Sequence, residues 1–146
     1  MSACARQGSA AVPAIELKAG IPGADEFREL RVAAGLSPKT AIAAQWGLEG
    51  SLFAVCVRDA GTLIGMGRVI GDGGLNFEIV DVAVHPDYQG QGYGLRIMEA
   101  LMDYINEHAP ESAYVSLIAD RGAPALYEKF GFEFTAPDSV AMAKRI

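Results

Sequence analysis

The segment EIVDVAVHPDYQGQGYGLRIMEALMDYI, residues 78–105, decides the fold of this chain. It begins with the β-branched and apolar residues of a strand, which ends at Pro86 because proline cannot donate to a sheet ladder. Three glycines, Gly90, Gly92 and Gly94, alternate in the loop that follows. From Gly94 onward apolar residues recur at helical spacing, so the segment predicts a strand, a glycine-rich loop and a helix.

The alternating glycines indicate a binding site for phosphate. Backbone N–H groups converge at the start of a helix, where the aligned peptide dipoles sum to about half a positive charge. Glycine lacks a Cβ, so a ligand can approach the backbone closely. A GxGxxG motif starting at Gly90 fails because Leu95 replaces its last glycine, and GxxxxGKS/T matches nowhere. For the glycines alone, a flexible turn without a ligand is the alternative interpretation.

Apolar periodicity and turn residues predict the elements on either side of this segment. Strands are expected at 15–19, 52–57, 63–70, 75–84, 114–118, 132–135 and 140–143, and helices at 24–34, 37–46, 94–109 and 123–130. Ser37 is the expected N-cap of the second helix, with Pro38 at its first position. These elements predict an α+β fold, or mixed α/β, with a central mixed sheet of about seven strands and four helices.

The order of the strands predicts their directions. Strands 52–57, 63–70 and 75–84 follow one another through short turns, so they should form an antiparallel meander. Strand 114–118 is reached through a helix and should therefore lie parallel to 75–84 in a right-handed crossover.

Length and composition fit a single domain. The 146 residues are 51% apolar and 21% charged, which is enough for one core without disulfides, and only two cysteines are present. Residues 13–146 are expected to form this domain, preceded by a flexible leader at 1–12. The formal charge of −6 disfavours nucleic acid as a partner. No apolar run predicts a membrane span or an export signal, so a cytoplasmic protein is expected.

Three segments together resemble the GNAT superfamily, the GCN5-related N-acetyltransferases. The loop Gln89-Gly90-Gln91-Gly92-Tyr93-Gly94 matches the family pattern Gln/Arg-x-x-Gly-x-Gly/Ala. The strand Glu78–Val84 looks like the strand that offers backbone groups to acetyl-CoA, and Leu126–Phe132 looks like the later helix. The resemblance implies the family's mixed sheet, whose parallel central strands splay apart, and acetyl-CoA as cosubstrate.

The resemblance also implies which residues bind acetyl-CoA. The N–H groups of residues 91–95 would hold the pyrophosphate, while Val82 and Val84 would pair with pantetheine like an added strand. The Val82 N–H would then stabilise charge on the thioester oxygen. Asp120 stands where many members have an asparagine that contacts the cofactor. Because the residue differs here, the resemblance implies this contact less strongly for Asp120. The full expected set is Val82, Ala83, Val84, Gln89, Gly90, Gln91, Gly92, Tyr93, Gly94, Leu95 and Asp120.

Acyl transfer to an amine calls for a base, because an amine of pKa about 10.4 is protonated at pH 7. Glu78 is the first candidate, since some GNAT members carry a strand glutamate there that draws the proton through water. The alternative is a plain surface carboxylate. Asp81 is the second candidate. Strict alternation places its side chain on the face of the strand opposite to that of Glu78. A β-bulge near residues 80–82 would change which of the two acids faces the gap between the parallel strands.

Tyr127 is expected to protonate the leaving thiolate, in the place where the family commonly has a general acid. The alternative is a helix tyrosine with a packed ring and a solvated hydroxyl. The other reactive side chains favour structural roles: His85 as a strand-end cap, His108 at a helix terminus, and Cys56 as a core residue. Trp46 and Phe53 could line an apolar pocket, although core packing is the favoured use of each.

The sequence therefore predicts an N-acetyltransferase that passes acetyl from acetyl-CoA to a primary amine by direct attack in a ternary complex. A CoA-binding sensor or scaffold without turnover, and a nucleotide-phosphate binder unrelated to CoA, are the alternatives. The acceptor is a small-molecule or peptide amine, and a homodimer is possible. No metal, nucleic acid or membrane is expected as a partner.

Overall fold

The structure is a computed structural model that describes residues 14–146. The leader expected at residues 1–12 lies outside the described residues. Among the helices of residues 14–146, none combines the length and the apolar character that a membrane crossing requires.

One mixed sheet of five strands runs through the described chain, in the order β1-β2-β3-β4-β5. Its strands are β1 (Ile15–Ala19), β2 (Phe53–Asp59), β3 (Thr62–Gly71), β4 (Asn76–Val84) and β5 (Tyr114–Leu117). Neighbours from β1 to β4 are antiparallel, whereas β5 is parallel to β4. The expected meander and parallel pair are confirmed. The expectation of about seven strands is wrong.

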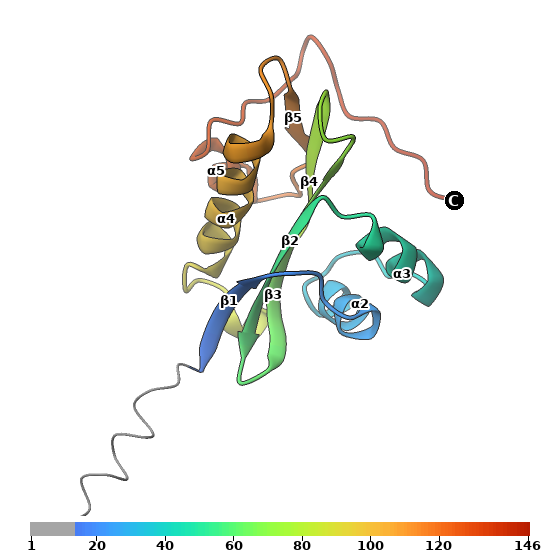
Figure 1. The fold of residues 1–146 in the computed structure, drawn as a ribbon, viewed down its shortest axis with the longest axis vertical. Coiled ribbons are helices and arrows are strands. Elements are labelled where there is room, and N and C mark those ends of the chain that lie inside the picture. Colours follow the sequence, from blue (N-terminus) through green and yellow to red (C-terminus); the bar gives the residue numbers. More distant parts are fainter. Residues whose placement is uncertain (1–13) are drawn as a thin grey trace, which may run out of the picture.

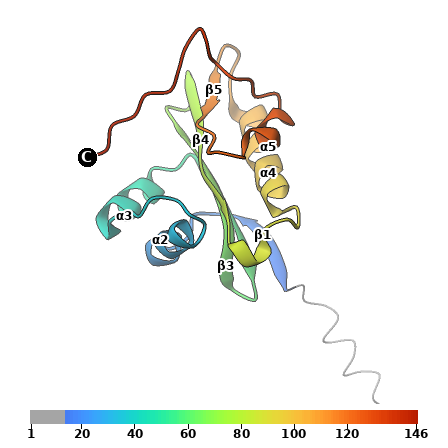
Figure 2. The ribbon, with the colours of Figure 1, turned by 180° about the vertical axis from the view of Figure 1, so that it is seen from behind.

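Helices cover both faces of this sheet (Figures 1 and 2). Helices α2 (Ala24–Ala33) and α3 (Ala41–Glu49) lie on one face, and α4 (Tyr93–His108) and α5 (Pro124–Glu128) lie on the other. A short 3-10 turn, η1 (Pro86–Tyr88), joins β4 to the loop before α4. The four expected helices are present, although α5 is shorter than the predicted range 123–130.

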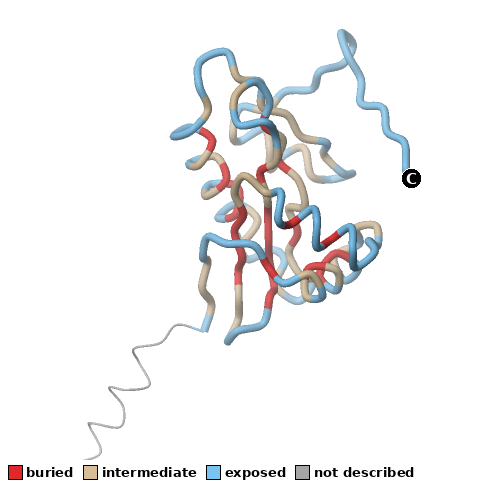
Figure 3. Tube along the Cα trace, turned by 45° about the vertical axis from the view of Figure 1, so that its right-hand side comes forward, coloured by how far each residue is buried: buried red, intermediate tan, exposed pale blue. Residues whose placement is uncertain are grey.

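Two cores separated by the sheet explain why β2 and β3 are apolar along most of their length. Val55 and Val57 of β2 pack with Ile97 and Leu101 of α4 in one core. Between them, Cys56 points to the other face and packs in the core of α2 and α3. Alternate residues of a strand point to opposite faces, so covering both faces buries consecutive residues. Figure 3 shows this buried centre running along the strands and the inner sides of the helices.

The segment after α5 forms no strand. The expected strands at 132–135 and 140–143 are absent, and the segment runs past β5 without joining the sheet. Length does not explain this, because β5 also has four residues; what the two runs lack is a paired neighbouring strand. Instead a turn forms between them, in which the Ser139 N–H donates to the Thr135 carbonyl at 3.1 Å.

Helix α3 begins later than the sequence predicts, and its cap is a different residue. The Thr40 hydroxyl accepts a hydrogen bond from the Ala43 N–H at 3.2 Å, so Thr40 is the N-cap. The expected cap, Ser37, has other partners, because both its carbonyl and its hydroxyl accept hydrogen bonds from Arg31. The residue expected to cap α3 is thus bound by a side chain of α2.

A β-bulge interrupts β4, as expected near residues 80–82. Val80 lies opposite Arg68 and Ala83 lies opposite Met66, so Asp81 and Val82 together face Gly67. Asp81 has a φ of 57°, in the left-handed region that aspartate tolerates better than most residues. The bulge changes the direction of every side chain beyond it and so shapes the end of the strand.

Candidate active site

Strands β4 and β5 are paired along only part of their length. Their parallel register runs from Asn76 opposite Tyr114 to Ile79 opposite Leu117 and then ends. Beyond that point β4 continues to Val84 with β3 alone as its neighbour. The resulting opening between the strands lies beside the bulge, and it is the splayed geometry that the resemblance implies.

The open edge of β4 presents the backbone of two expected cosubstrate-binding residues. The His85 N–H donates to the Ile64 carbonyl of β3 at 2.7 Å, so this end of β4 faces β3 at position 85. Since backbone groups of alternate residues point to opposite edges, those of Val84 and Val82 face the open side. Ala83 differs, because its side chain is buried in the core of α2 and its backbone groups belong to the β3 edge.

The loop after β4 leads into an uncapped helix N-terminus, that of α4. Gly92 is the N-cap of α4 with a φ of 87°, and no side chain caps the first amides of this helix. Gly90 also has a positive φ, of 76°, and a Cβ at either glycine would meet nothing within 4 Å. The amides of Tyr93, Gly94 and Leu95 therefore begin α4 beside open space, which is the geometry that favours an anion.

Two side chains of the loop fix it to the sheet. The Gln89 side-chain amide donates to the Val84 carbonyl at 2.9 Å, so Gln89 is held by the strand that it follows. The Tyr88 hydroxyl donates to the carboxylate of Asp59 at the end of β2. This hydrogen bond to a carboxylate raises the pKa of Tyr88. The contact between Tyr88 and Asp59 was missed by the sequence interpretation, which had no means of pairing residues so far apart.

A cleft of about 580 Å³ lies at the opening and gathers the expected catalytic residues. Its walls come from the connection between α2 and α3, from β4, from the segment after β5 and from α5. Glu78, Asp81, Asp120 and Tyr127 all line it. Residues separated by about fifty positions in the sequence thus meet in one hollow, as the resemblance implies.

Of the two candidate bases, Asp81 has a carboxylate that is already bound by other side chains. Its carboxylate forms ion pairs with Arg31 of α2 and with Arg68 of β3, the latter at 2.8 Å from Nε to Oδ2. All three side chains are about nine-tenths buried. The sequence interpretation missed both arginines, although an arginine inside the apolar strand LIGMGRVIG is a signal for a buried anionic partner.

Glu78 is in a different situation. It lies on β4 opposite Ser116 of β5, one position before the last pair of the parallel ladder. It is half-buried, and among the described residues no hydrogen bond or ion pair involves its carboxylate. Of the two candidate bases, Glu78 is therefore the one whose lone pairs are available to an incoming group.

Tyr127 reaches the cleft from α5. Burial raises the pKa of its hydroxyl, and the nearby carboxylate of Asp120 raises it further, so the phenol stays protonated at neutral pH. A protonated phenol can donate a hydrogen bond or a proton, which is what the expected role requires. Asp120 lines the cleft beside it.

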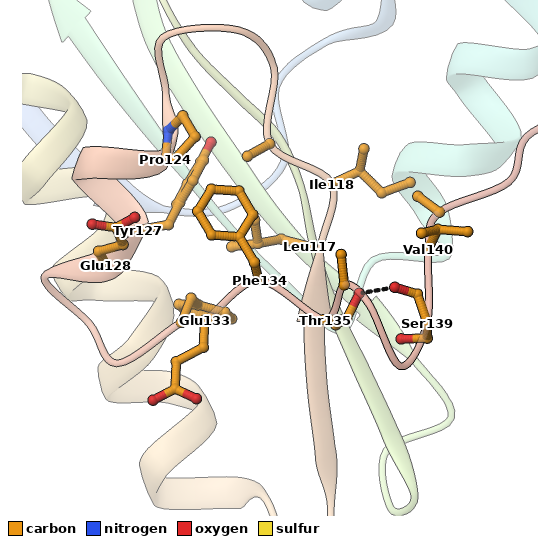
Figure 4. A pocket seen from close by; sticks show the side chains of 14 residues that line it. Leu117, Ile118, Pro124, Tyr127, Glu128, Glu133, Phe134, Thr135, Ser139 and Val140 are labelled. Atoms are coloured by element: carbon orange, nitrogen blue, oxygen red, sulfur yellow. Dashed lines mark hydrogen bonds between the residues drawn. The ribbon is translucent and has the colours of Figure 1, made fainter.

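Tyr127 also borders a second, apolar hollow of about 280 Å³ between β5, α5 and the C-terminal segment (Figure 4). Leu117, Phe134 and Val140 contribute apolar side chains to its walls. Ile118 and Tyr127 line both this hollow and the cleft. The phenol ring thus forms part of the boundary between a polar space and an apolar one.

The remaining reactive side chains lie outside the cleft. His85 accepts a hydrogen bond from the Asp87 N–H at 3.1 Å and so caps η1. His108 stacks on Tyr104, with ring centroids 4.2 Å apart, at the end of α4. Cys56 is buried in the core, where desolvation raises the pKa of its thiol. The core position predicted for Cys56 is confirmed, whereas His85 caps η1 and not the end of the strand.

The expectation of core packing holds for one of the two remaining aromatic residues. Phe53 stacks on Tyr104, with ring centroids 4.6 Å apart, and packs against the core of α4. Trp46 is 68% exposed on α3, so its predicted core packing is wrong. It sits on the outer side of a helix that is already covered by α2.

Comparison with known proteins supports the family resemblance. A profile of the acetyltransferase (GNAT) family matches residues 24–132. A crystal structure from methicillin-resistant Staphylococcus aureus, named as protein SA2161 of unknown function and a probable acetyltransferase, is 52% identical with a TM-score of 0.88. The alignment covers 90% of this chain and 99% of that one.

Curated relatives match over a shorter stretch. The uncharacterized N-acetyltransferase ycf52 of Porphyra purpurea is 36% identical over 78 residues, which is 53% of this chain and 43% of that protein. The chloroplastic GCN5-related N-acetyltransferase 2 of Arabidopsis thaliana is 39% identical over 71 residues, or 49% of this chain and 27% of that protein. The chain thus spans less than half the length of these relatives. With a family profile that covers most of the described sheet and its helices, the chain belongs to the acetyltransferase (GNAT) family.

Proposed function

We propose that this chain is an N-acetyltransferase that transfers acetyl from acetyl-CoA to a primary amine by direct attack in a ternary complex. The observation that carries the proposal is that one cleft, at the point where β4 and β5 part, is lined by both Glu78 and Tyr127. One residue is a carboxylate without a partner in the described chain, and the other is a protonated phenol. A base and an acid on opposite walls suit an acyl transfer.

In this proposal the two backbone features beside the cleft hold acetyl-CoA. The amides of residues 93–95 and the loop before them bind the pyrophosphate at the N-terminus of α4. The open edge of β4 accepts pantetheine as a peptide-like extra strand, through the backbone of Val82 and the N–H of Val84, whose carbonyl already accepts from Gln89. The Val82 N–H then faces the thioester oxygen and stabilises the negative charge that develops there.

Proton transfers follow from the two side chains. At pH 7 an amine of pKa about 10.4 is almost wholly protonated, so it must lose a proton before it attacks the thioester. Glu78 takes this proton, directly or through water. When the carbon–sulfur bond breaks, the thiolate of CoA leaves, and Tyr127 donates a proton to it. We assign the base to Glu78 rather than Asp81 because two arginines occupy the Asp81 carboxylate.

The test is release of free thiol from acetyl-CoA in the presence of a panel of primary amines. The panel should contain polar and apolar amines in equal number, because Tyr127 borders both a polar cleft and an apolar hollow. We expect turnover with a subset of the panel. Tight binding of acetyl-CoA without turnover on any amine would instead support a sensor or scaffold.

The Tyr127→Phe variant tests the proposed acid. It keeps the ring that packs against Phe132, with centroids 6.5 Å apart, and removes only the hydroxyl. We expect kcat to fall about hundredfold, the lower end of the range for a positioned proton donor. Calorimetry should show an unchanged affinity for acetyl-CoA. Full turnover in the variant would remove Tyr127 from the mechanism.

A further inference from the structure

The bulge of β4 is held by a buried cluster of three charged side chains. Asp81 lies at the bulge, Arg31 comes from α2, and Arg68 comes from β3 directly opposite Val80. The two guanidinium groups lie against the same buried ring, that of Phe27, at 5.7 Å and 5.8 Å from its centroid. One carboxylate therefore compensates two buried cations, and this carboxylate belongs to the most strained residue of the strand.

Each arginine connects Asp81 to a further part of the chain. Arg31 donates from Nε to the Ser37 carbonyl at 2.8 Å and from Nη2 to the Ser37 hydroxyl at 3.1 Å. Arg68 donates from Nη1 to the Gly47 carbonyl at 3.0 Å and to the Ser51 hydroxyl at 2.8 Å. Through these contacts Asp81 fixes the connection between α2 and α3 and also the end of α3.

These contacts reach both sides of the cleft. Ser37 belongs to the wall formed by the α2–α3 connection, whereas Asp81 and Val82 belong to the wall formed by β4. Val82 is the residue whose N–H faces the open edge as a consequence of the bulge. A short path, from Ser37 through Arg31 and Asp81 to Val82, thus joins the two walls.

We infer that Asp81 is a positioning residue that sets the distance between the two walls of the cleft. Its ion pairs with Arg31 and Arg68 fix its carboxylate in place. This inference rests on the proposed function, in which acetyl-CoA lies along β4 and the amine lies between it and the opposite wall. Without the Asp81 charge, two buried guanidinium groups lose their common anion. The ion pairs then no longer fix the bulge of β4, and acetyl-CoA and the amine are no longer held in the correct position relative to each other.

The main test compares Asp81→Asn with Glu26→Gln. Asparagine keeps the shape of the side chain and also tolerates a positive φ, so the change removes chiefly the charge. Glu26 offers a matched control, because it ties the same helix to the same sheet by two hydrogen bonds to Arg58, at 2.6 Å and 2.8 Å, but does not line the cleft. Both variants should unfold at lower urea concentrations, and only Asp81→Asn should change the kinetics.

For Asp81→Asn we expect a fall in kcat/KM of about ten- to hundredfold, the effect of misplaced reactants, with higher KM values for both acetyl-CoA and amine. The acidic limb of the kcat–pH profile should keep its midpoint. A catalytic base would behave differently: its loss would abolish that limb and lower kcat while both KM values stayed constant. That result, or kinetics identical to Glu26→Gln, would overturn the inference.

A second variant, Arg68→Gln, tests the inference if Asp81→Asn does not fold. Arg68 does not line the cleft, and among its side-chain hydrogen-bond partners only Asp81 does, so Arg68→Gln acts on the cleft chiefly through Asp81. We expect the same rise in both KM values, and a smaller further loss when the two changes are combined, because they break the same contact. Unchanged KM values in Arg68→Gln would count against the inference.

Calorimetry separates failure of this inference from failure of the proposed function. If the wild-type chain binds acetyl-CoA but turns over no amine, the proposed reaction is wrong. The role of Asp81 in setting the β4 wall can then still be measured. The inference predicts that Asp81→Asn weakens acetyl-CoA binding at least fivefold. An acetyl-CoA affinity of Asp81→Asn within twofold of that of Glu26→Gln would overturn the inference.

Discussion

Strand β4 has two edges of unequal completeness. On the β3 side it is paired from Phe77 opposite Gly71 to Val84 opposite Gly65, with one bulge. On the β5 side it has four pairs, and the ladder ends at Ile79. The closed edge satisfies the backbone within the fold. The open edge leaves backbone groups available to a ligand, as an unpaired strand edge does in general.

This difference separates two kinds of residue. Outside the Asp81 cluster, changes along the closed edge and in the helices that pack on the sheet should alter stability, whereas changes along the open edge should alter binding or turnover. The four variants below test whether the separation holds, in order of the expected effect. Two of them lie on the open side and two on the closed side.

Glu78→Gln on the open side should have the largest effect. The amide keeps the size of the side chain but cannot accept the proton of the amine, so kcat/KM should fall by about 10²- to 10⁴-fold. Thiol release across a pH series at saturating amine measures this fall. Affinity for acetyl-CoA serves as the control and should not change. Full turnover in the variant at all pH values would return the role of base to Asp81 or to solvent.

Gly71→Ala on the closed side should be the most damaging to the fold. A Cβ at Gly71, which has a φ of 146°, would lie 2.0 Å from the Asn76 carbonyl oxygen in the turn between β3 and β4. Strain and collision together should cost about 3 kcal/mol of unfolding free energy. Urea unfolding measures this loss. The fraction that remains folded should bind acetyl-CoA normally, and weaker binding by that fraction would contradict the separation of the two edges.

The strand, loop and helix around Gly92 could be predicted from the sequence because their determinants are local. Glycine spacing, Pro86 and helical periodicity act within a few residues of one another. The same holds for the meander, whose turns are short. The bulge and the gathering of Glu78 and Tyr127 were reached only through the family resemblance.

The errors of the sequence interpretation arise where residues distant in the sequence determine the local structure. The start of α3 was misplaced, since Thr40 is the N-cap and Arg31 binds the Ser37 hydroxyl. For Asp81, the second candidate base, the sequence did not predict the ion pair with Arg68. The two missing strands had suitable apolar runs, but a strand exists only if a partner edge pairs with it. In this structure Val140 and Met142 stay 68% and 91% exposed.

Gly92→Val should affect the open side by an intermediate amount. The site of its Cβ is open space, so the collision that Gly71→Ala causes in the fold is absent here. The φ of 87° is nevertheless unfavourable for valine, and the added methyl groups would stand where the pyrophosphate is proposed to lie. We expect acetyl-CoA to bind roughly tenfold more weakly, the loss of about one charge-assisted hydrogen bond. Calorimetry with acetyl-CoA measures it.

The control for Gly92→Val is Gly73→Val, another glycine with a positive φ, of 81°, and nothing within 4 Å of its Cβ. It carries a similar conformational cost but lies in the turn between β3 and β4, and it does not line the cleft. The two variants should lose similar stability, and only Gly92→Val should lose affinity for acetyl-CoA. Equal affinities would place the pyrophosphate elsewhere.

Glu26→Gln on the closed side should have the smallest effect, and the effect should depend on pH. The hydrogen bond from Arg58 lowers the pKa of Glu26 in the folded chain below its unfolded value of about 4.3. A lowered pKa means that the ion pair stabilises the fold above the unfolded value, and that this contribution is lost as the pH falls through the folded value. Because both side chains are about one-third exposed, it should stay below about 1 kcal/mol.

Urea unfolding of Glu26→Gln and the wild-type chain at pH 7 and at pH 3 measures this contribution. The difference in stability should be present at pH 7 and should shrink towards pH 3, while kcat/KM at pH 7 stays equal in the two proteins. This pair and the Asp81 cluster both tie α2 to the sheet, but only the cluster reaches the cleft. A loss of activity in Glu26→Gln would mean that any loosening of α2 disturbs the cleft, and the open and closed sides of the sheet would then not be separable.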